Sequence, residues 1–155
     1  MENKIGIGYF LSPLGFIKIK EQNNKVHFLK FVICEDEKEN VTPLILKAKQ
    51  ELYEYFNKER KYFDLPININ GTPFQKKVYN ALTKIPYGKT QSYNDVAVAI
   101  NNGKAFRAVG NTNNKNQLFL LVPCHRVTRK DSNLSGTKEW IKMQKWLIEF
   151  EKGNL

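Results

Sequence analysis

The stretch 118–127, LFLLVPCHRV, constrains this chain more than any other. Its first five residues are apolar, and a short apolar run of this kind predicts a buried strand. Pro123 should end strand pairing, because proline lacks the N–H that a strand ladder needs. The next three residues are Cys124, His125 and Arg126. A thiol, an imidazole and a guanidinium are therefore expected together at the end of a rigid element.

Cys124 has two interpretations. A lone cysteine after an apolar run is commonly a small buried hydrophobe. The thiolate is the reactive form of cysteine, however, and neighbouring His or Arg side chains favour it. The residues alone leave both a core cysteine and an activated nucleophile open.

The composition is that of an ordinary globular protein of 155 residues, either one domain or two small ones. No apolar stretch approaches the ~20 residues of a membrane helix, and the first residues lack a signal-peptide pattern. The two cysteines, Cys34 and Cys124, do not form a disulfide framework, which favours a reducing cytosol. Two Cys and two His permit zinc, but no ligand spacing supports it.

The net charge of +10 is unevenly distributed. Residues 1–71 hold 11 Lys and Arg against 10 Asp and Glu, whereas residues 72–155 hold 14 against 5. A basic half beside a neutral half favours binding of a polyanion, most simply nucleic acid. The alternative is a lysine-rich surface that serves solubility.

The N-terminal half predicts a small antiparallel sheet and a helix. Apolar or alternating runs at 5–11, 16–20 and 26–33 are typical of strands. Cys34, at the end of the third strand, is expected to be structural. Thr42 and Pro43 begin a helix to about Lys58, as N-cap and first helical residue. Residues 60–70, which include Pro66, form the expected domain boundary.

The C-terminal half predicts helices. Thr72, Pro73 and Gln75 form a capping box for a helix to about Lys84. Ser92 with Asp95 begins a second helix, to about Ile100, and a third starts near Lys104 after an Asn-Asn-Gly turn. Two short helices around such a turn suggest a helix-turn-helix, although helical hairpins of other kinds are common. A last helix should run from about Thr137 to Glu151.

Pro123-Cys-His-Arg-Val127 resembles the active-site signature of the O6-alkylguanine-DNA alkyltransferases, or methylated-DNA–protein-cysteine methyltransferases. Further blocks agree in order and spacing over roughly residues 71–152. They are Gly71-Thr-Pro-Phe-Gln75, Ile85-Pro-Tyr-Gly-Lys-Thr90, Ser92-Tyr93, Arg107-Ala-Val-Gly110, Asn116 and Trp146-Leu-Ile-Glu-Phe-Glu151.

The resemblance implies a chemistry in which Cys124 attacks the alkyl carbon on guanine O6 and keeps the alkyl group. His125 would remove the thiol proton through a water, and Glu151 would orient His125. Tyr93 would hydrogen-bond the base and assist its protonation. Asn116 would fix the turn before the active-site strand. Without the resemblance, Glu151 would be a solvated helix-end carboxylate and Tyr93 a half-buried aromatic.

The resemblance also implies DNA contacts, because the target atom lies inside a duplex and the nucleotide must be flipped out. Arg107 matches the inserted arginine of the family, although by itself it could be a phosphate contact or a surface charge. Ala105, Ala108 and Gly110 would let the second helix approach the minor groove. Further DNA contacts are assigned to Arg126, Thr90 and Ser92, and the substrate pocket to Val127, Thr137, Lys138 and Tyr93.

The chain departs from the family pattern at three positions. Gln117 stands where the family commonly has proline, so that turn is expected to be looser. In the loop at 135–140, Thr137 replaces the tyrosine that walls the pocket and Glu139 replaces a glycine. These two changes leave pocket selectivity, above all for bulky alkyl groups, open.

We therefore expect an α+β fold in two domains. Residues 1–65 should form a ribonuclease H-like structural domain with an antiparallel sheet and a helix. Residues 71–155 should form a mostly helical DNA-binding and alkyltransferase domain, with the active-site cysteine after a short strand.

The expected function is direct DNA repair, in which a monomer flips O6-alkylguanine from double-stranded DNA and is spent by one irreversible transfer to Cys124. No cofactor or metal is expected, since the acceptor is the protein itself. The location would be the cytoplasm, or the nucleus in a eukaryote. The alternatives are a module that binds alkylated DNA without transfer, a helix-turn-helix regulator with Cys124 as a sensor, and a cysteine hydrolase. Such modules in the family lack the cysteine, which is present here.

Overall fold

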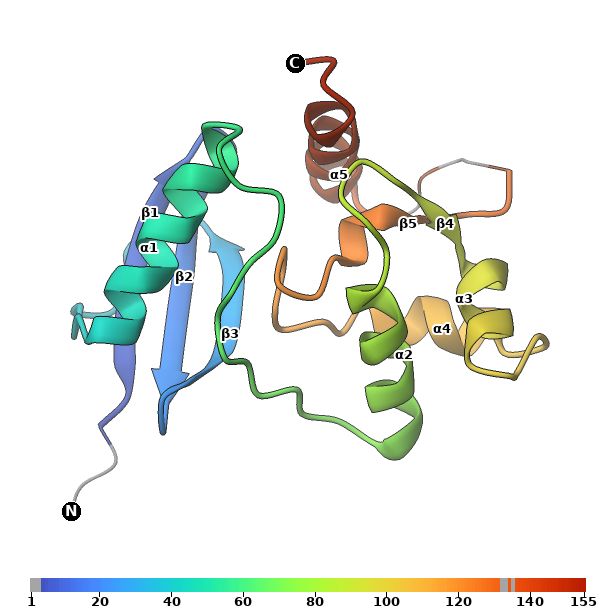
Figure 1. Cartoon of the computed structure of the whole chain (residues 1–155), viewed down its shortest axis with the longest axis horizontal. Coiled ribbons are helices and arrows are strands. Elements are labelled where there is room, and N and C mark those ends of the chain that lie inside the picture. The colour runs from blue at the N-terminus through green and yellow to red at the C-terminus, as the bar shows by residue number, and fades with distance from the viewer. Residues whose placement is uncertain (1–3, 132–133, 135) are drawn as a thin grey trace. The chain divides into compact units, whose positions relative to one another are not determined.

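The structure is a computed structural model and describes residues 4–131, 134 and 136–155. Its elements in chain order are β1 (Gly6–Ser12), β2 (Gly15–Gln22), β3 (Lys25–Val32), α1 (Pro43–Phe56), α2 (Pro73–Thr83), β4 (Gln91–Ser92), α3 (Tyr93–Ala99), α4 (Phe106–Asn113), the 3-10 turn η1 (Cys124–Arg126), β5 (Val127–Thr128) and α5 (Lys138–Glu151) (Figure 1). The α+β class expected from the sequence is confirmed.

The chain forms two compact units. The N-terminal unit holds the chain up to Asn70 together with Gln117–Leu121, and the C-terminal unit holds Gly71–Asn116 and Val122–Leu155. The segment Gln117–Leu121 thus returns to the N-terminal unit, a connection that the sequence did not indicate.

The N-terminal unit is a three-stranded antiparallel sheet in the order β1-β2-β3, with α1 along the sheet (Figure 1). The expected helix start is confirmed, since the Thr42 hydroxyl accepts a hydrogen bond from the Ile45 N–H at 3.3 Å. The core contains the fully buried side chains Ile17, Ile19, Leu29, Ile45, Leu52 and Tyr55. Their burial supplies the hydrophobic stabilisation that holds α1 to the sheet.

The strand expected over residues 118–122 is wrong. Leu118 forms only an isolated bridge with Leu29, and the chain then turns. Leu120 has a left-handed φ of 69°, which strand geometry excludes. Two i to i+2 hydrogen bonds, from Leu121 N–H to the Phe119 carbonyl and from Cys124 N–H to the Val122 carbonyl, tighten the path. Cys124 therefore begins a 3-10 turn, and the short strand β5 follows it.

Cys34 is also placed differently from the expectation. It lies beyond β3, which ends at Val32, and it is exposed. The side chain therefore has no part in the core of the N-terminal unit.

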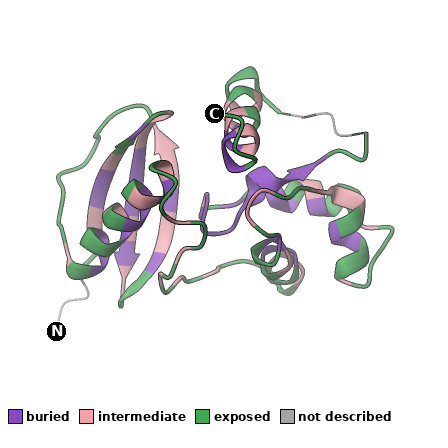
Figure 2. Cartoon of the chain, turned by 45° about the horizontal axis from the view of Figure 1, so that its top comes forward, coloured by how far each residue is buried: buried purple, intermediate pink, exposed green. Residues whose placement is uncertain are grey.

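The C-terminal unit surrounds the segment from η1 to β5. Helices α2, α3 and α4 lie on one side of this segment and α5 on the other, and the segment itself is buried (Figures 1 and 2). β4 pairs with β5 in parallel, with Ser92 opposite Thr128. The nucleophile candidate is thus held inside this unit, not on a free loop.

Helices α3 and α4 form the helix-turn-helix that the sequence suggested. Ser92 caps α3 and makes a reciprocal capping box with Asp95. Thr72 and Gln75 make the same arrangement at α2, and Thr137 caps α5 through the Trp140 N–H. Each cap satisfies backbone N–H groups that a helix start leaves without partners.

Candidate active site and nucleic-acid interface

Cys124 is the first residue of η1 and only 2% exposed. Its carbonyl accepts a hydrogen bond from Asn113 Nδ2 at 3.3 Å. Asn116 Nδ2 donates to the Val122 carbonyl at 2.8 Å, which is the turn contact expected of this asparagine. Two amides near the end of α4 thus hold the backbone on both sides of Pro123. Asn113 was not singled out from the sequence, because nothing in its spacing distinguishes it from its neighbours.

Glu151 lies at the end of α5 and binds both residues that follow the cysteine. Its Oε2 is 2.8 Å from His125 Nε2 and accepts a hydrogen bond from Arg126 Nη2 at 2.9 Å. Its Oε1 accepts from Arg126 Nε at 2.8 Å. The contact between His125 and Glu151 is the one that the resemblance implied.

Burial and the neighbouring charges shift the pKa values of both His125 and Glu151. Burial lowers the pKa of His125, and the nearby Arg126 charge adds to the effect against the opposing influence of Glu151. Burial by itself would raise the pKa of Glu151, but the hydrogen bonds and charges of His125 and Arg126 hold it well below its usual range. We therefore treat His125 as a neutral imidazole that donates Nε2–H to an ionised carboxylate. The Nδ1 atom is then the basic nitrogen.

Arg126 was expected to contact DNA, and the structure corrects this assignment. The side chain is 9% exposed, forks onto both oxygens of Glu151, and donates from Nη1 to the Ile85 carbonyl at 2.8 Å. A buried guanidinium needs such partners, since an unpaired charge in the interior is costly. Arg126 is an internal ion-pair partner of Glu151.

The block Ile85-Pro-Tyr-Gly-Lys-Thr90 gains a physical explanation from the same group. The Ile85 carbonyl accepts the hydrogen bond from Arg126 described above. The centre of the Tyr87 ring lies 5.8 Å from the Arg126 guanidinium carbon. Gly88 donates its N–H to Glu151 Oε1 at 3.3 Å. Its φ is 78°, and a Cβ there would lie 3.1 Å from the Glu151 carbonyl oxygen. Glycine is thus required by both the backbone conformation and the close approach.

Gln144 on α5 supports the turn from another side. Its buried Nε2 donates to the carbonyls of His125, at 3.1 Å, and Val127, at 2.8 Å. These carbonyls flank Arg126, so one side chain fixes the backbone through η1. The sequence offered no signal for Gln144 beyond its place within the last helix.

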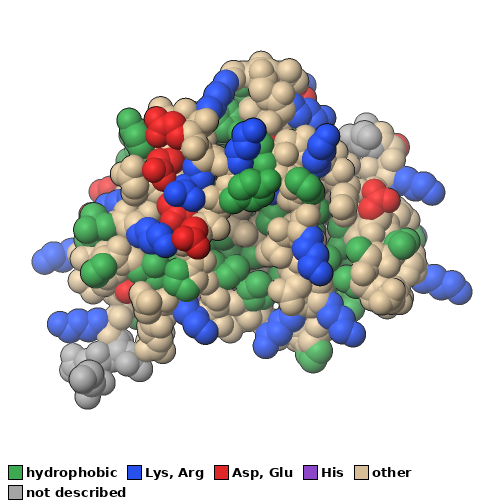
Figure 3. Space-filling model, in the orientation of Figure 1, with side chains coloured by type: hydrophobic (Ala, Val, Ile, Leu, Met, Phe, Trp, Pro, Cys, Tyr) green, Lys and Arg blue, Asp and Glu red, His purple; other side chains and the backbone are tan. Residues whose placement is uncertain are grey.

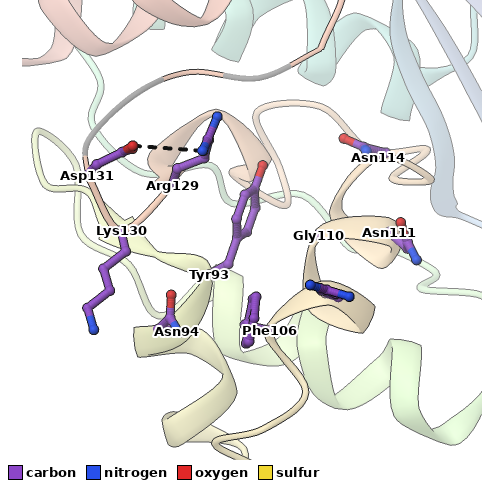
Figure 4. A pocket seen from close by; sticks show the side chains of 10 residues that line it. Tyr93, Asn94, Phe106, Gly110, Asn111, Asn114, Arg129, Lys130 and Asp131 are labelled. Carbon is purple, nitrogen blue, oxygen red and sulfur yellow. Dashed lines mark ion pairs between the residues drawn. The ribbon is translucent and has the colours of Figure 1, made fainter.

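An open cavity of about 850 Å³ lies beside the helix-turn-helix. Tyr93 and Asn94 of α3, residues of α4, and the chain after β5 line it (Figure 4). Gly110 lies next to the Tyr93 ring, and a Cβ there would be in ordinary van der Waals contact with the ring, at 3.9 Å. Arg129 and Asp131, on the same segment of the cavity lining, form an ion pair at 3.8 Å (Figure 4). Of the residues expected to form a substrate pocket, Tyr93 lines this cavity.

The other expected pocket residues, Val127, Thr137 and Lys138, are not among the residues that line this cavity. Val127 is fully buried in β5. Thr137 is the N-cap of α5, and exposed Lys138 is its first residue. Glu139 stands in the first helical turn, where a carboxylate favours the helix dipole. Ser135 of the same loop lies outside the described residues.

The residues expected to bind DNA gather around α4 and α3, apart from Arg126. Arg107 and Ala108 are exposed on α4, Ala105 is its N-cap, and Gly110 lies in its middle. Thr90 and Ser92 line a second cavity of about 410 Å³, next to Arg129 and Lys130. Lysine and arginine side chains are exposed on the face of the C-terminal unit that Figure 3 shows. The charge and the exposed α4 together suit a nucleic-acid backbone.

These features define a class of protein: a helix-turn-helix nucleic-acid binder that also holds a buried cysteine beside an imidazole and a carboxylate. Two family models match nearly the whole chain. Residues 73–153 match the DNA binding domain of 6-O-methylguanine DNA methyltransferase, and residues 5–69 match the ribonuclease-like domain of the same protein. The chain therefore belongs to the 6-O-methylguanine DNA methyltransferase family.

Individual relatives agree with this assignment. The constitutive methylated-DNA–protein-cysteine methyltransferase of Bacillus subtilis is 47% identical over 134 residues, which cover 81% of each chain. A probable methylated-DNA–protein-cysteine methyltransferase of Acanthamoeba polyphaga mimivirus is 34% identical and covers 92% of this chain and 94% of its own. The crystal structure of the Mycobacterium tuberculosis O6-methylguanine methyltransferase is 31% identical, with a TM-score of 0.87 and coverage of 98% and 95%. The same fold was solved for the Mycobacterium tuberculosis protein in complex with DNA, with a TM-score of 0.85, 32% identity and coverage of 97% and 93%.

Within residues 4–131, 134 and 136–155, no group of three or more His, Cys, Asp or Glu side chains is placed to hold a metal ion. None of the helices that the structure describes has the length and apolar character to cross a bilayer.

Proposed function

We propose that this protein repairs O6-alkylguanine in double-stranded DNA by moving the alkyl group onto Cys124. The observation that carries the proposal is the position of Cys124 on a buried turn whose next residue, His125, contacts Glu151 at 2.8 Å. A cysteine beside an oriented base is the arrangement of an activated nucleophile. Similarity to methylated-DNA–protein-cysteine methyltransferases, one of them solved with DNA, supports the choice of reaction and substrate.

The proposed reaction is a single displacement. His125 Nδ1 takes the thiol proton through a water, while Glu151 stays ionised and stabilises the imidazolium that forms. The sulfur attacks the alkyl carbon, a C–S bond forms, and the bond from carbon to guanine O6 breaks. The departing guanine carries the electron pair and recovers a proton, assisted by the Tyr93 phenol. Guanine is restored and a thioether remains on the protein.

The transfer should occur once per molecule. A thioether has no leaving group comparable to guanine, so the proposed product is stable and the protein is consumed. No cofactor takes part in this scheme, because the cysteine is both nucleophile and acceptor.

Access to the lesion requires nucleotide flipping. We propose that α4 enters the minor groove, with Ala105, Ala108 and Gly110 permitting close approach and Arg107 filling the space left in the stack. Thr90 and Ser92, beside Arg129 and Lys130, would hold the backbone of the same duplex. The flipped base would lie against Tyr93. The backbone N–H of Lys138 would contact the substrate oxygen, and Val127 and Thr137 would complete the pocket.

The two parts of the chain are proposed to differ in role. Residues 1–65 would be a structural ribonuclease H-like domain, and residues 71–155 would carry DNA binding and chemistry. The protein is proposed to act as a monomer in the cytoplasm, or in the nucleus of a eukaryote.

The test is the intact mass of the protein after incubation with a duplex that carries one O6-methylguanine. The expected result is a gain equal to one methyl group in place of one hydrogen, mapped to Cys124 by peptide analysis. Cys124→Ser should show no gain while it retains lesion binding. An unchanged mass of the unmodified protein together with tight, lesion-selective binding would overturn transfer and indicate a binding module.

A further inference from the structure

Phe106 is a large apolar side chain in an unexpected place. It is the first residue of α4 and 40% exposed. Among the described residues of the C-terminal unit it is the one aromatic side chain in the exposed class. An exposed aromatic ring beside a proposed DNA-contacting arginine calls for a physical explanation.

Phe106 lies at the border of the core face of α4, three residues before buried Val109, and its 40% exposure sets it apart from that face. The buried residues of this helix are Val109, Thr112 and Asn113. The cavity is lined instead by Phe106, Arg107, Gly110, Asn111 and Asn114. Steps of three and four residues connect the members of that second set, so they form one continuous stripe. Phe106 thus lies where the core face meets the cavity-lining face, and its exposed part faces the cavity.

The Phe106 ring is paired with Arg107. The guanidinium carbon of Arg107 lies 5.9 Å from the centre of the ring, within the range of a cation–π contact. Both groups are planar, and both line the cavity into which the Tyr93 side chain also extends (Figure 4). The stripe they share has no acidic member, so nothing on it repels a phosphate backbone.

We propose that Phe106 and Arg107 act together as a paired wedge during nucleotide flipping. Apolar side chains inserted into the minor groove offset the cost of unstacking a base step. Phe106 would stack against the base step beside the extruded nucleotide, while Arg107 fills the vacated position. The ring contact also keeps the guanidinium aligned before DNA arrives. The inference rests on the proposed function and adds a residue to its flipping step.

The test compares substrates that differ in the cost of flipping. Single-turnover transfer is measured for the unmodified protein and Phe106→Ala with three substrates: the duplex lesion, the same lesion in a single strand, and free O6-methylguanine. We expect Phe106→Ala to be about tenfold slower on the duplex and within about twofold of the unmodified protein on the other two. Phe106→Trp, which keeps a stacking ring, should retain most of the duplex rate, and Phe106→Leu should lie between.

The matched control is Tyr62→Ala, which removes a 70% exposed aromatic ring from the N-terminal unit. It should leave all three rates unchanged. Equal slowing of Phe106→Ala on all substrates would overturn the wedge and assign Phe106 a structural role in α4. An unchanged duplex rate would overturn it as well. Failure of the unmodified protein to gain a methyl group from any substrate would instead contradict the proposed function.

Discussion

Glu151 Oε2 lies 2.8 Å from His125 Nε2, and both oxygens of the same carboxylate accept hydrogen bonds from the Arg126 guanidinium. The carboxylate therefore has two tasks. It holds the imidazole through Nε2, which leaves Nδ1 as the basic nitrogen, and it neutralises a buried arginine. Since Arg126 and His125 are adjacent in η1, one helix-end residue fixes the whole turn that begins with Cys124.

Replacing Glu151 with Gln should strongly destabilise the C-terminal unit. The change leaves the buried Arg126 charge without its counter-ion, and breaking a buried pair in this way costs about 3–5 kcal/mol. The free energy of unfolding from urea titration measures the effect. Glu139→Gln, an exposed carboxylate in the first turn of the same helix, should lose less than about 1 kcal/mol. Losses of similar size in the two variants would show that the ion pair does not hold the turn.

The lowered pKa values of His125 and Glu151 predict that the folded protein loses stability in acid. Burial holds the pKa of His125 below the ordinary 6.5, so below that pH the unfolded chain binds a proton that the folded chain resists. The pKa of Glu151 is also held below its ordinary 4.5, so its contribution is present above that pH and is lost as pH falls toward the folded value. Stability should therefore be constant near neutrality, fall from about pH 6.5 downward, and fall further below about pH 4.5.

Urea unfolding at several pH values, with His125→Gln as the comparison, tests this dependence. The variant should lack the part of the decline between about pH 7 and pH 5 that belongs to His125. His27, whose pKa burial also lowers, is present in both proteins, so its contribution cancels in the difference. Equal slopes for the two proteins over that interval would contradict a buried neutral His125.

Local chemistry made a large part of this fold predictable from the sequence. Caps at Thr42, Thr72 and Ser92 are confirmed, because a hydroxyl that reaches an N–H three residues later depends on few other parts of the chain. The alternation in the first strands similarly marks a sheet with one covered face.

What escaped prediction depends on residues far apart in the chain. The run 118–122 has the composition of a strand, but its partner is a single residue of β3 and Leu120 reverses the chain. Arg126 was expected to contact DNA, whereas Glu151, 25 residues later, binds it in the interior. Gln144 and Asn113 act through backbone carbonyls, and such contacts leave no pattern in the sequence.

Arg107 and Phe106 should be coupled if they form one wedge. Arg107→Ala is expected to slow repair in duplex DNA by about tenfold and to leave the reaction with free O6-methylguanine within about twofold, since only the duplex requires flipping. The double variant with Phe106→Ala should be less impaired than the product of the two single effects, because the residues are in contact. Arg107→Lys, which keeps the charge but not the plane, is the matched control. Independent, multiplicative effects would mean that the two side chains act separately.

Gly88 and Gly153 form a matched pair for a last prediction. Both have a left-handed φ, 78° and 83°, but a Cβ on Gly88 would lie 3.1 Å from the Glu151 carbonyl oxygen, whereas a Cβ on Gly153 would meet nothing within 4 Å. Alanine at either position should cost about 1–2 kcal/mol in unfolding free energy for the backbone conformation. Gly88→Ala should lower the free energy of unfolding further, because the added Cβ would be too close to the backbone of Glu151, whose carboxylate binds His125 and Arg126. It should also slow methyl transfer from free O6-methylguanine, which Gly153→Ala should not. Urea unfolding and single-turnover transfer measure the two effects, and equal results for both variants would remove the close approach to Glu151 as the reason for glycine at position 88.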